Sequence, residues 1–219
     1  GTGIYTPTTV VDNHALARVM DTSDEWIQVR TGIAQRHYAA PDQATSDLAV
    51  PAARQAIERA GLQPDDIDYV IFATMTADYF FPGSAPFLQR KLGLQHVPCL
   101  DIRQQCAGFV YALQLADALI RSGQARRALV VGAENHASLI PWSDASWRVV
   151  LGQDEAPVTE AEYEHNTATR DRVVLFGDGA GAVAAGDRQD RRPARRPRDG
   201  RPGELLGRED TRAEQRRRA

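Results

Sequence analysis

Two continuous apolar runs constrain the fold of this chain more than any other feature. The segments DYVIFATM (68–75) and RALVVGAEN (127–135) have the length of strands but not the alternation of a half-exposed strand. Such runs are typical of parallel strands that helices cover on both faces. Segments 84–94 and 106–123, which lie between them, place apolar residues at helical spacing. This order predicts an α/β fold with a mainly parallel sheet.

Three further segments extend the pattern. SDLAVPAARQAIERAGL (46–62) reads as a helix, with Ser46 expected to cap its start and Gly61 to end it. VPCLDI (97–102) predicts another strand. Late in the chain, RVVLFGDGAGAVAAG (172–186) predicts a strand, a glycine turn and a second strand.

The pattern places one structured unit at residues 1–186. Near residues 136–170 the sequence becomes polar and acidic and contains Trp142 and Trp147, so we expect an inserted loop or lid there. The segments GTGIYT and GDGAGA are rich in glycine, but each lacks residues that a nucleotide-binding motif requires, so tight turns between strands explain them better.

Residues 187–219 differ from the rest in composition. They contain 12 Arg against 7 Asp plus Glu and almost no apolar residues, a composition that predicts disorder. A nucleic-acid-binding arm is the functional alternative, but no aromatic residue stands between the arginines to stack on bases. We favour a third interpretation, a reading-frame slip in a GC-rich coding sequence, and expect no nucleic-acid partner.

Composition narrows the class of protein. Hydrophobic residues make up 42% of the chain, enough for a core, and no run reaches the ~18 apolar residues of a membrane span. The two cysteines, Cys99 and Cys106, are too few for a disulfide framework, which favours a cytoplasmic protein. Their spacing, and that of the histidines, fits no metal site.

Cys106 is the first candidate for chemistry. It stands between a predicted strand and the predicted helix that ends near Gly123. The N–H groups and partial positive charge at a helix start stabilise a thiolate, the form of cysteine that attacks an acyl carbon. A small buried cysteine is the alternative, and it is common. Cys99 lies within a strand pattern and fits the core better.

The segment DTSDEWIQVRTGIAQRH (21–37) is the second candidate. Trp26 and Arg30 are four residues apart, so on a helix they share one face. An indole beside a guanidinium can hold an adenine ring or a phosphate. An ordinary surface pair is the alternative.

Three segments, in this order, resemble one family. DTSDEWIQVRTGI (21–33), CAGFVYAL (106–113) and FGDGAGA (176–182) are similar to β-ketoacyl-acyl-carrier-protein synthase III, of the thiolase superfamily, and the resemblance covers residues 1 to about 185. It implies a layered α-β-α-β-α fold of which this chain supplies about one half. It also implies a homodimer that works in the cytoplasm and starts fatty-acid synthesis without a cofactor.

The resemblance assigns roles to individual residues. It implies that Cys106 takes a short acyl group from acyl-coenzyme A and that malonyl-acyl carrier protein then loses carbon dioxide and condenses with it. Thr22, Trp26 and Arg30 match the coenzyme A-binding segment. Arg172 is the candidate for a second adenine-stacking arginine, and Phe81 matches a phenylalanine that lines the partner's acyl pocket.

The sequence also departs from the family pattern. The family completes its active site with a histidine and an asparagine, and none of the five histidines of this chain stands in a matching motif. Loss of one such donor costs roughly a hundredfold to a thousandfold in rate. We therefore expect a truncated copy, and two alternatives stay open: a non-catalytic remnant that dimerises or binds acyl-coenzyme A, and a condensing enzyme of secondary metabolism.

Overall fold

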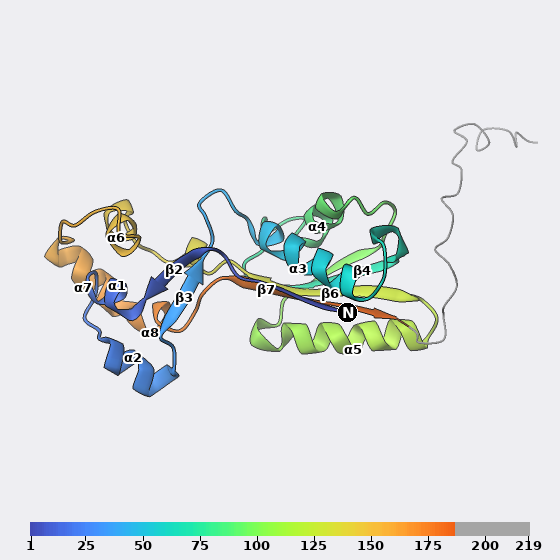
Figure 1. Cartoon of the computed structure of the whole chain (residues 1–219), viewed down its shortest axis with the longest axis horizontal. Helices are drawn as coiled ribbons and strands as arrows, with labels where there is room; N and C mark the ends of the chain where they lie inside the picture. The colour runs from blue at the N-terminus through green and yellow to red at the C-terminus, as the bar shows by residue number, and fades with distance from the viewer. Residues whose placement is uncertain (187–219) are drawn as a thin grey trace, which may run out of the picture.

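A mixed five-stranded sheet is the frame of the protein. The computed structural model describes residues 1–186, so the predicted tail 187–219 lies outside the described residues. The strands lie in the order β1-β7-β6-β4-β5 (Figure 1). Their bounds are Thr2–Tyr5 for β1, Tyr69–Ala73 for β4, Cys99–Ile102 for β5, Arg127–Glu134 for β6 and Gly179–Gly186 for β7.

The sheet is less parallel than the sequence suggested. β4 pairs in parallel with β5 and with β6, whereas β7 runs antiparallel to both β6 and β1. The expectation of a mainly parallel sheet is therefore wrong for half of the strand pairs. A parallel neighbour would need a connection that crosses back over the sheet, and the connection between β6 and β7 contains no such crossover helix. The chain therefore re-enters the sheet at the end where β6 stops, and β7 runs antiparallel to β6.

Helices cover both faces of the sheet, as the buried strands required. α3 (Thr45–Arg59) and α4 (Ala85–Leu92) lie on one face, and α5 (Gly108–Arg121) lies on the other (Figure 1). The 3₁₀ helices η1 (Pro64–Asp66) and η2 (Gln105–Ala107) precede β4 and α5, respectively. The predicted strands at β4, β5 and β6 and the predicted helices at α3, α4 and α5 are all confirmed.

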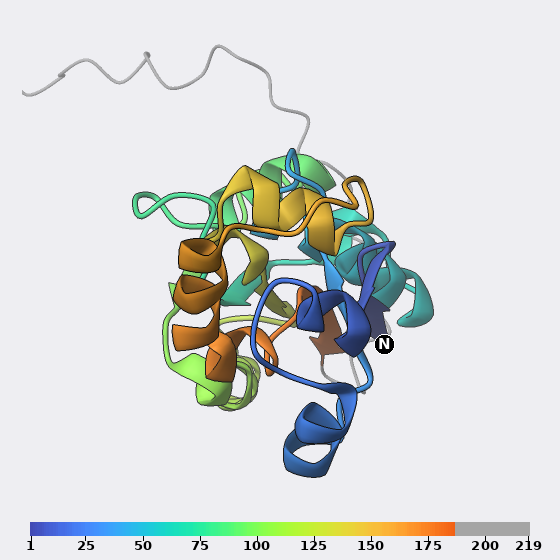
Figure 2. The same cartoon turned by 90° about the vertical axis from the view of Figure 1, so that its left-hand side faces the viewer.

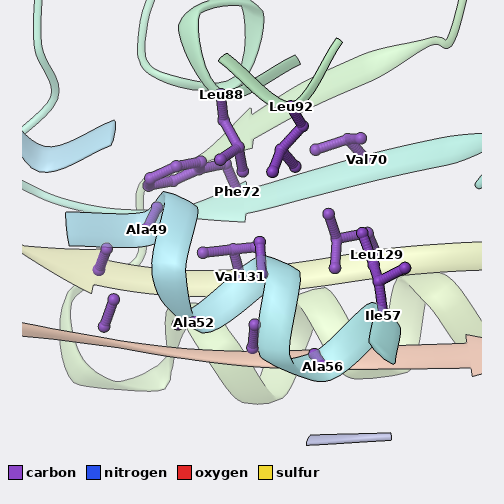
Figure 3. Packing of buried hydrophobic residues seen from close by; sticks show 14 of the residues in the cluster. Ala49, Ala52, Ala56, Ile57, Val70, Phe72, Leu88, Leu92, Leu129 and Val131 are labelled. Atoms are coloured by element: carbon purple, nitrogen blue, oxygen red, sulfur yellow. The ribbon is translucent and has the colours of Figure 1, made fainter. Parts of the chain in front are cut away.

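Small residues let α3 lie close to the sheet. The alanines of α3, such as Ala52 and Ala56, face the strands and are fully buried (Figure 3). A Cβ added to Gly3 of β1 would lie 2.0 Å from the carbonyl oxygen of Ala52, so only glycine fits there. Larger side chains, among them Phe72 and Leu88, fill the space beside α4.

The start of α3 differs from the prediction. The N-cap is Ala44, whose N–H donates to the Asp47 carboxylate at 3.0 Å, and the helix begins at Thr45. Ser46 therefore lies inside the first turn, where its backbone N–H donates to Asp78 at 2.8 Å. Ser46 is not the cap because a tertiary partner outside the helix binds it. Gly61, at φ +69°, follows the helix end as predicted.

A second cluster of short elements stands beside the sheet. It comprises the hairpin β2 (Thr9–Asp12) and β3 (Gln35–Tyr38) with α1 (Asn13–Ala17), α2 (Asp24–Thr31), η3 (Ala137–Leu139), α6 (Asp144–Val150), α7 (Glu160–Ala168) and α8 (Arg170–Val173). Figure 2 looks onto this end of the molecule, with α2 at the bottom. Its own apolar core includes the buried Trp142, Leu16 and Ile27.

The segments of this cluster correct two expectations. The segment 136–170 is largely helical, with Trp142 in the core, so its description as an inserted loop misses η3, α6 and α7. The strand expected after residue 172 is wrong, because residues Arg170–Val173 form α8. The second strand of that segment is confirmed as β7. Among residues 1–186, no helix is both long enough and apolar enough to cross a membrane.

Candidate active site

Cys106 stands at the start of α5, where the sequence placed it. It lies in η2, and α5 continues directly from Gly108. The residue before α5 is Ala107, whose side chain cannot cap the helix, and the first turn holds no acidic residue. The side chain of Cys106 is exposed. The thiol thus stands one residue before the N-cap of a 14-residue helix, at the end where the helix carries its partial positive charge.

The backbone before Cys106 is held in an uncommon conformation. Gln105 has φ +39°, a left-handed value that non-glycine residues rarely adopt. Such conformations persist only where the surroundings impose them, and they occur often at functional sites.

A cavity of about 460 Å³ opens beside Cys106. Its walls come from the start of α5, from the ends of β4 and β6, and from the β1 and β7 strands. Apolar atoms and backbone make up most of the lining, and Gly132 of β6 leaves room for the ring of Phe109, since an added Cβ would lie 2.9 Å from it. A short acyl chain matches these walls in polarity.

One polar residue of the cavity wall, Glu134, could not be identified from the sequence. The Glu134 carboxylate accepts hydrogen bonds from the backbone N–H groups of Met75 at 2.8 Å and Thr76 at 3.1 Å, and from the hydroxyls of Thr74 at 3.1 Å and Thr76 at 2.5 Å. It thereby fixes the turn that follows β4. No local pattern could reveal this role, because the partners stand 58–60 residues away along the chain.

Trp26 and Arg30 share one face of α2, as predicted. The guanidinium carbon of Arg30 lies 4.2 Å from the centre of the indole, and its Nη1 donates to the Trp26 carbonyl at 3.2 Å. A second guanidinium, that of Arg170, lies 4.7 Å from the same ring. The Thr22 hydroxyl nearby in the sequence is buried and has no hydrogen-bond partner. A planar ring with two cations suits an adenine and its phosphates.

Arg170, not Arg172, is the residue of α8 that the structure brings to this ring. Arg170 donates to the Asp21 carbonyl and lies 3.2 Å from the Asp21 carboxylate, and these contacts hold its side chain over Trp26. The side chain of Arg172 is exposed. The assignment of Arg172 to an adenine site therefore stays a prediction, and Arg170 is the residue that sequence reasoning missed.

The structure does not bring all the predicted residues together. Neither Trp26 nor Arg30 lines the cavity at Cys106. Phe81 lies in the connection between β4 and α4 with 87% of its surface exposed, next to Phe80 at 89%, and it does not line the cavity either. The role of Phe81 in a partner's acyl pocket stays a prediction. Cys99 is half-buried against the core, as expected.

The histidines stand apart from the cysteine. Among the described residues, none that lines the cavity is a histidine. His136 stacks on Phe176 with ring centres 4.5 Å apart, and its buried Nδ1 has no partner. Within residues 1–186, no three His, Cys, Asp or Glu side chains are grouped as a metal site would need.

Comparisons with known proteins agree on one family. Residues 100–157, which include Cys106, match the family described as 3-Oxoacyl-[acyl-carrier-protein (ACP)] synthase III. The β-ketoacyl-[acyl-carrier-protein] synthase III of Cereibacter sphaeroides is 49% identical over 178 residues, which are 81% of this chain and 55% of the relative. That of Laribacter hongkongensis is 45% identical over 190 residues, 87% of this chain and 52% of the relative.

Solved structures give the same result. The 3-oxoacyl-[acyl-carrier-protein] synthase III of Aquifex aeolicus superposes with a TM-score of 0.72 at 38% identity, covering 87% of this chain and 53% of that structure. The priming β-ketosynthase of the R1128 polyketide pathway gives 0.68 at 33% identity, covering 85% and 48%. The thiolase-like fold class is confirmed, and the chain spans about half the length of the relatives it matches. The chain belongs to the β-ketoacyl-acyl-carrier-protein synthase III family.

Proposed function

We propose that this chain accepts a short acyl group from acyl-coenzyme A on Cys106, as the first half of the synthase III reaction. The observation that carries the proposal is the exposed Cys106 thiol at the uncapped start of α5, beside a mainly apolar cavity. In the proposed step the Cys106 sulfur bonds to the thioester carbonyl carbon and the coenzyme A thiolate leaves. The proton of the Cys106 thiol passes to that thiolate or to water. The backbone N–H of Cys106 contributes to the oxyanion hole.

Binding of the coenzyme A moiety is the second part of the proposal. Trp26, Arg30 and Arg170 form the adenine and phosphate platform, with Thr22 beside them in the sequence. Support comes from the two guanidiniums within 4.7 Å of the indole centre. Arg172 is the alternative cation, as the family resemblance implies.

The complete reaction is part of the proposal for the whole family protein. There, malonyl-acyl carrier protein loses carbon dioxide, and the resulting carbanion attacks the acyl-Cys106 thioester to start a fatty acid. The described residues place no histidine in the Cys106 cavity, so we propose that this chain performs acylation and not condensation. A homodimer in which Phe81 reaches its partner, and a cytoplasmic location, complete the proposal.

Intact-mass spectrometry after incubation with acetyl-coenzyme A tests the function. We expect a mass increase of one acetyl group that maps to Cys106 and that hydroxylamine removes, as it does thioesters. Cys99→Ser serves as the matched control and should still acylate, whereas Cys106→Ser should not. A folded wild-type chain that takes up no acetyl group would refute the proposal and favour a non-catalytic remnant.

One observation favours a second candidate function, that of a condensing enzyme of secondary metabolism. The structural neighbours include the priming β-ketosynthase of a polyketide pathway at a TM-score of 0.68. An acylation rate that is much higher with a longer or branched acyl-coenzyme A than with acetyl-coenzyme A would favour that alternative.

A further inference from the structure

The connection between β4 and α4 exposes two aromatic rings and yet is fixed at both ends. We call residues 78–84 the phenylalanine loop. Phe80 and Phe81 are 89% and 87% exposed, so their own side chains contribute little packing to hold it. The loop is held by two carboxylates, Asp78 at its start and Asp101 at its end.

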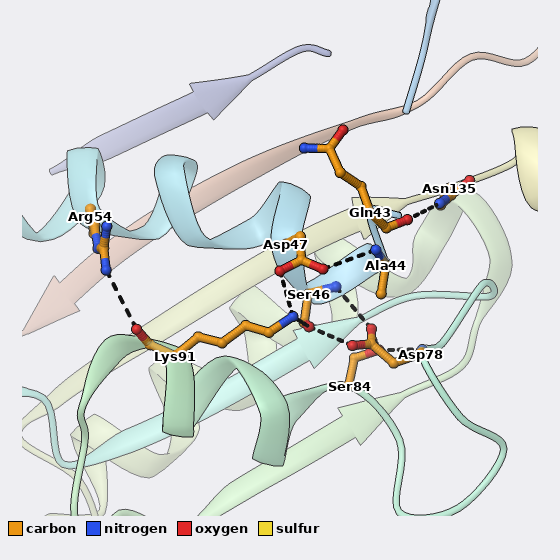
Figure 4. A network of polar contacts seen from close by, with 9 residues as sticks. All are labelled: Gln43, Ala44, Ser46, Asp47, Arg54, Asp78, Ser84, Lys91 and Asn135. Atoms are coloured by element: carbon orange, nitrogen blue, oxygen red, sulfur yellow. Dashed lines mark hydrogen bonds and ion pairs between the residues drawn. The ribbon is translucent and has the colours of Figure 1, made fainter. Parts of the chain in front are cut away.

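Asp78 ties the start of the loop to α3 (Figure 4). Its carboxylate accepts hydrogen bonds from the Ser46 backbone N–H at 2.8 Å, from the Ser46 hydroxyl, and from the Ser84 hydroxyl at 2.9 Å. The Lys91 ammonium of α4 donates to the Ser46 hydroxyl and to Asp47, both at 2.6 Å. These contacts join the loop to the two helices on one face of the sheet.

Asp101 ties the end of the loop to a different element, strand β5. Its carboxylate accepts from the backbone N–H groups of Ser84 at 2.7 Å and Ala85 at 3.1 Å. It thus caps the start of α4, a role that the Ser84 side chain does not perform. Gly83 has φ +101°, and an added Cβ would lie 2.7 Å from the Asp101 carboxyl carbon, so the loop lies directly on this carboxylate.

Strand β5 leads from Asp101 to the nucleophile. Ile102 accepts a backbone hydrogen bond from Thr74 at 3.1 Å, and the chain then passes through Arg103 into η2, which contains Cys106. Arg103 makes a further contact with the loop, because its guanidinium carbon lies 5.1 Å from the centre of the Phe80 ring. Strand β5 therefore supports both the phenylalanine loop, through Asp101, and the segment that contains Cys106.

We propose that Asp101 is a positioning residue that couples the end of the phenylalanine loop to the segment 103–106, so that the contact of residues 83–85 with Asp101 and the placement of the Cys106 sulfur go together. The proposal rests on the proposed function for its consequence, because Phe81 there lines an acyl pocket and Cys106 carries the acyl group. A purely structural role, in which Asp101 only caps α4, would not transmit anything to Cys106.

Asp101→Asn separates these two roles, with two measurements that need no coenzyme A. The first is cleavage of the native chain by chymotrypsin after Tyr79 or Phe80, which reports on loop order. The second is the rate at which iodoacetamide alkylates Cys106. Loss of charge-assisted hydrogen bonds should speed cleavage about tenfold. Release of the segment 103–106 should slow alkylation about fivefold, because the sulfur leaves the helix start.

Control variants make the assignment specific. Asp117→Asn, on the exposed side of α5, removes one carboxylate that contacts Arg121 and should change neither rate. Asp78→Asn should speed cleavage but leave alkylation unchanged, because it frees the start of the loop from α3 while the N–H groups of Ser84 and Ala85 keep their hydrogen bonds to Asp101. If Asp101→Asn fails to fold, Gly83→Ala replaces it, since the added methyl group lifts the loop from an intact Asp101.

Each combination of the two rates decides for or against the coupling. Faster cleavage with slower alkylation in Asp101→Asn or Gly83→Ala supports it. Unchanged cleavage, or faster cleavage with unchanged or faster alkylation, overturns it, as does slower alkylation in Asp78→Asn. Acetylation of the wild-type chain by acetyl-coenzyme A is measured in parallel, so a failure of the proposed function shows itself without affecting either rate.

Discussion

Replacing Arg170 by alanine should weaken binding of coenzyme A, and replacing Arg172 should not. The two residues are two positions apart in α8, and each substitution removes one positive charge. Of these two residues, Arg170 alone lies on the Trp26 ring, with its guanidinium carbon 4.7 Å from the ring centre. A difference between the two variants therefore reports the contact with the ring and not the net charge of the chain.

The size of the effect follows from this geometry. The Arg170 side chain is 30% exposed, so its attraction to an aromatic ring and a phosphate is partly screened by water. A cation–π contact at such a site contributes about 0.5–1 kcal/mol, and a charge-assisted hydrogen bond to a phosphate adds a similar amount. The sum, about 1–2 kcal/mol, corresponds to a dissociation constant roughly 5–30 times higher. For Arg172→Ala we expect a change of less than about twofold.

Isothermal titration calorimetry with coenzyme A measures these constants without acylating Cys106. Loss of the contacts between Arg170 and Asp21 could also loosen α8, so the thermal midpoint of each variant is compared with that of the wild type. The single variants and a Trp26→Ala, Arg170→Ala double variant form a double-mutant cycle. A coupling free energy near zero would show that the two residues act independently in binding coenzyme A. An Arg172→Ala variant that binds as weakly as Arg170→Ala, or more weakly, would refute the assignment and restore the one based on sequence.

Three further outcomes are expected. Cys106→Ser should abolish the acetyl adduct while leaving the dissociation constant for coenzyme A within about twofold, as titration and intact-mass spectrometry would show. Phe72→Ala, at a fully buried ring, should lower the free energy of unfolding by about 3–5 kcal/mol, whereas Phe80→Ala, at an exposed ring, should change it by less than about 0.5 kcal/mol in urea titrations. Burial opposes the ionisation of Asp47, but hydrogen bonds from Lys91 and a backbone N–H outweigh it and lower the pKa. The stabilisation by the Asp47 carboxylate should therefore be complete above the usual aspartate pKa of about 4 and should fade as the pH falls below it, so the difference in unfolding midpoint between wild type and Asp47→Asn should shrink in acid.

Local patterns predicted the elements that local physics decides. The apolar runs at β4 and β6 and the helical spacing of α3 and α5 are properties of consecutive residues, and the structure confirms them. The place of Cys106 at a helix start follows from the junction of two such patterns. The pair Trp26 and Arg30 was predictable for the same reason, because a helix brings residues four positions apart together.

Features that depend on contacts between distant segments were missed. Serine is a common N-cap residue, but Ser46 is bound by Asp78, which lies 32 residues away along the chain. Arg170 rather than Arg172 meets Trp26 because Asp21, 149 residues away, holds its side chain. The antiparallel entry of β7 depends on how the segment 136–170 packs within the second cluster, and the helices of that segment are too short to show an apolar period in the sequence.

The residues around Cys106 also bear on whether an acyl group on its sulfur would be released. Formation of the thioester needs an exposed sulfur, donors at the helix start and room for the acyl chain, and all three are present at η2 and α5. Hydrolysis or condensation needs a base or an oxyanion donor aimed at the same carbonyl, and the cavity is lined by Glu134, whose carboxylate already accepts four hydrogen bonds from residues 74–76. Three of these hydrogen bonds go to Oε2 and one goes to Oε1, and together they hold the carboxylate on residues 74–76. An acyl group transferred to Cys106 should consequently persist, and acylation should stop after one turnover per chain. Continuous release of coenzyme A beyond one equivalent would show that a base outside this set acts on the thioester.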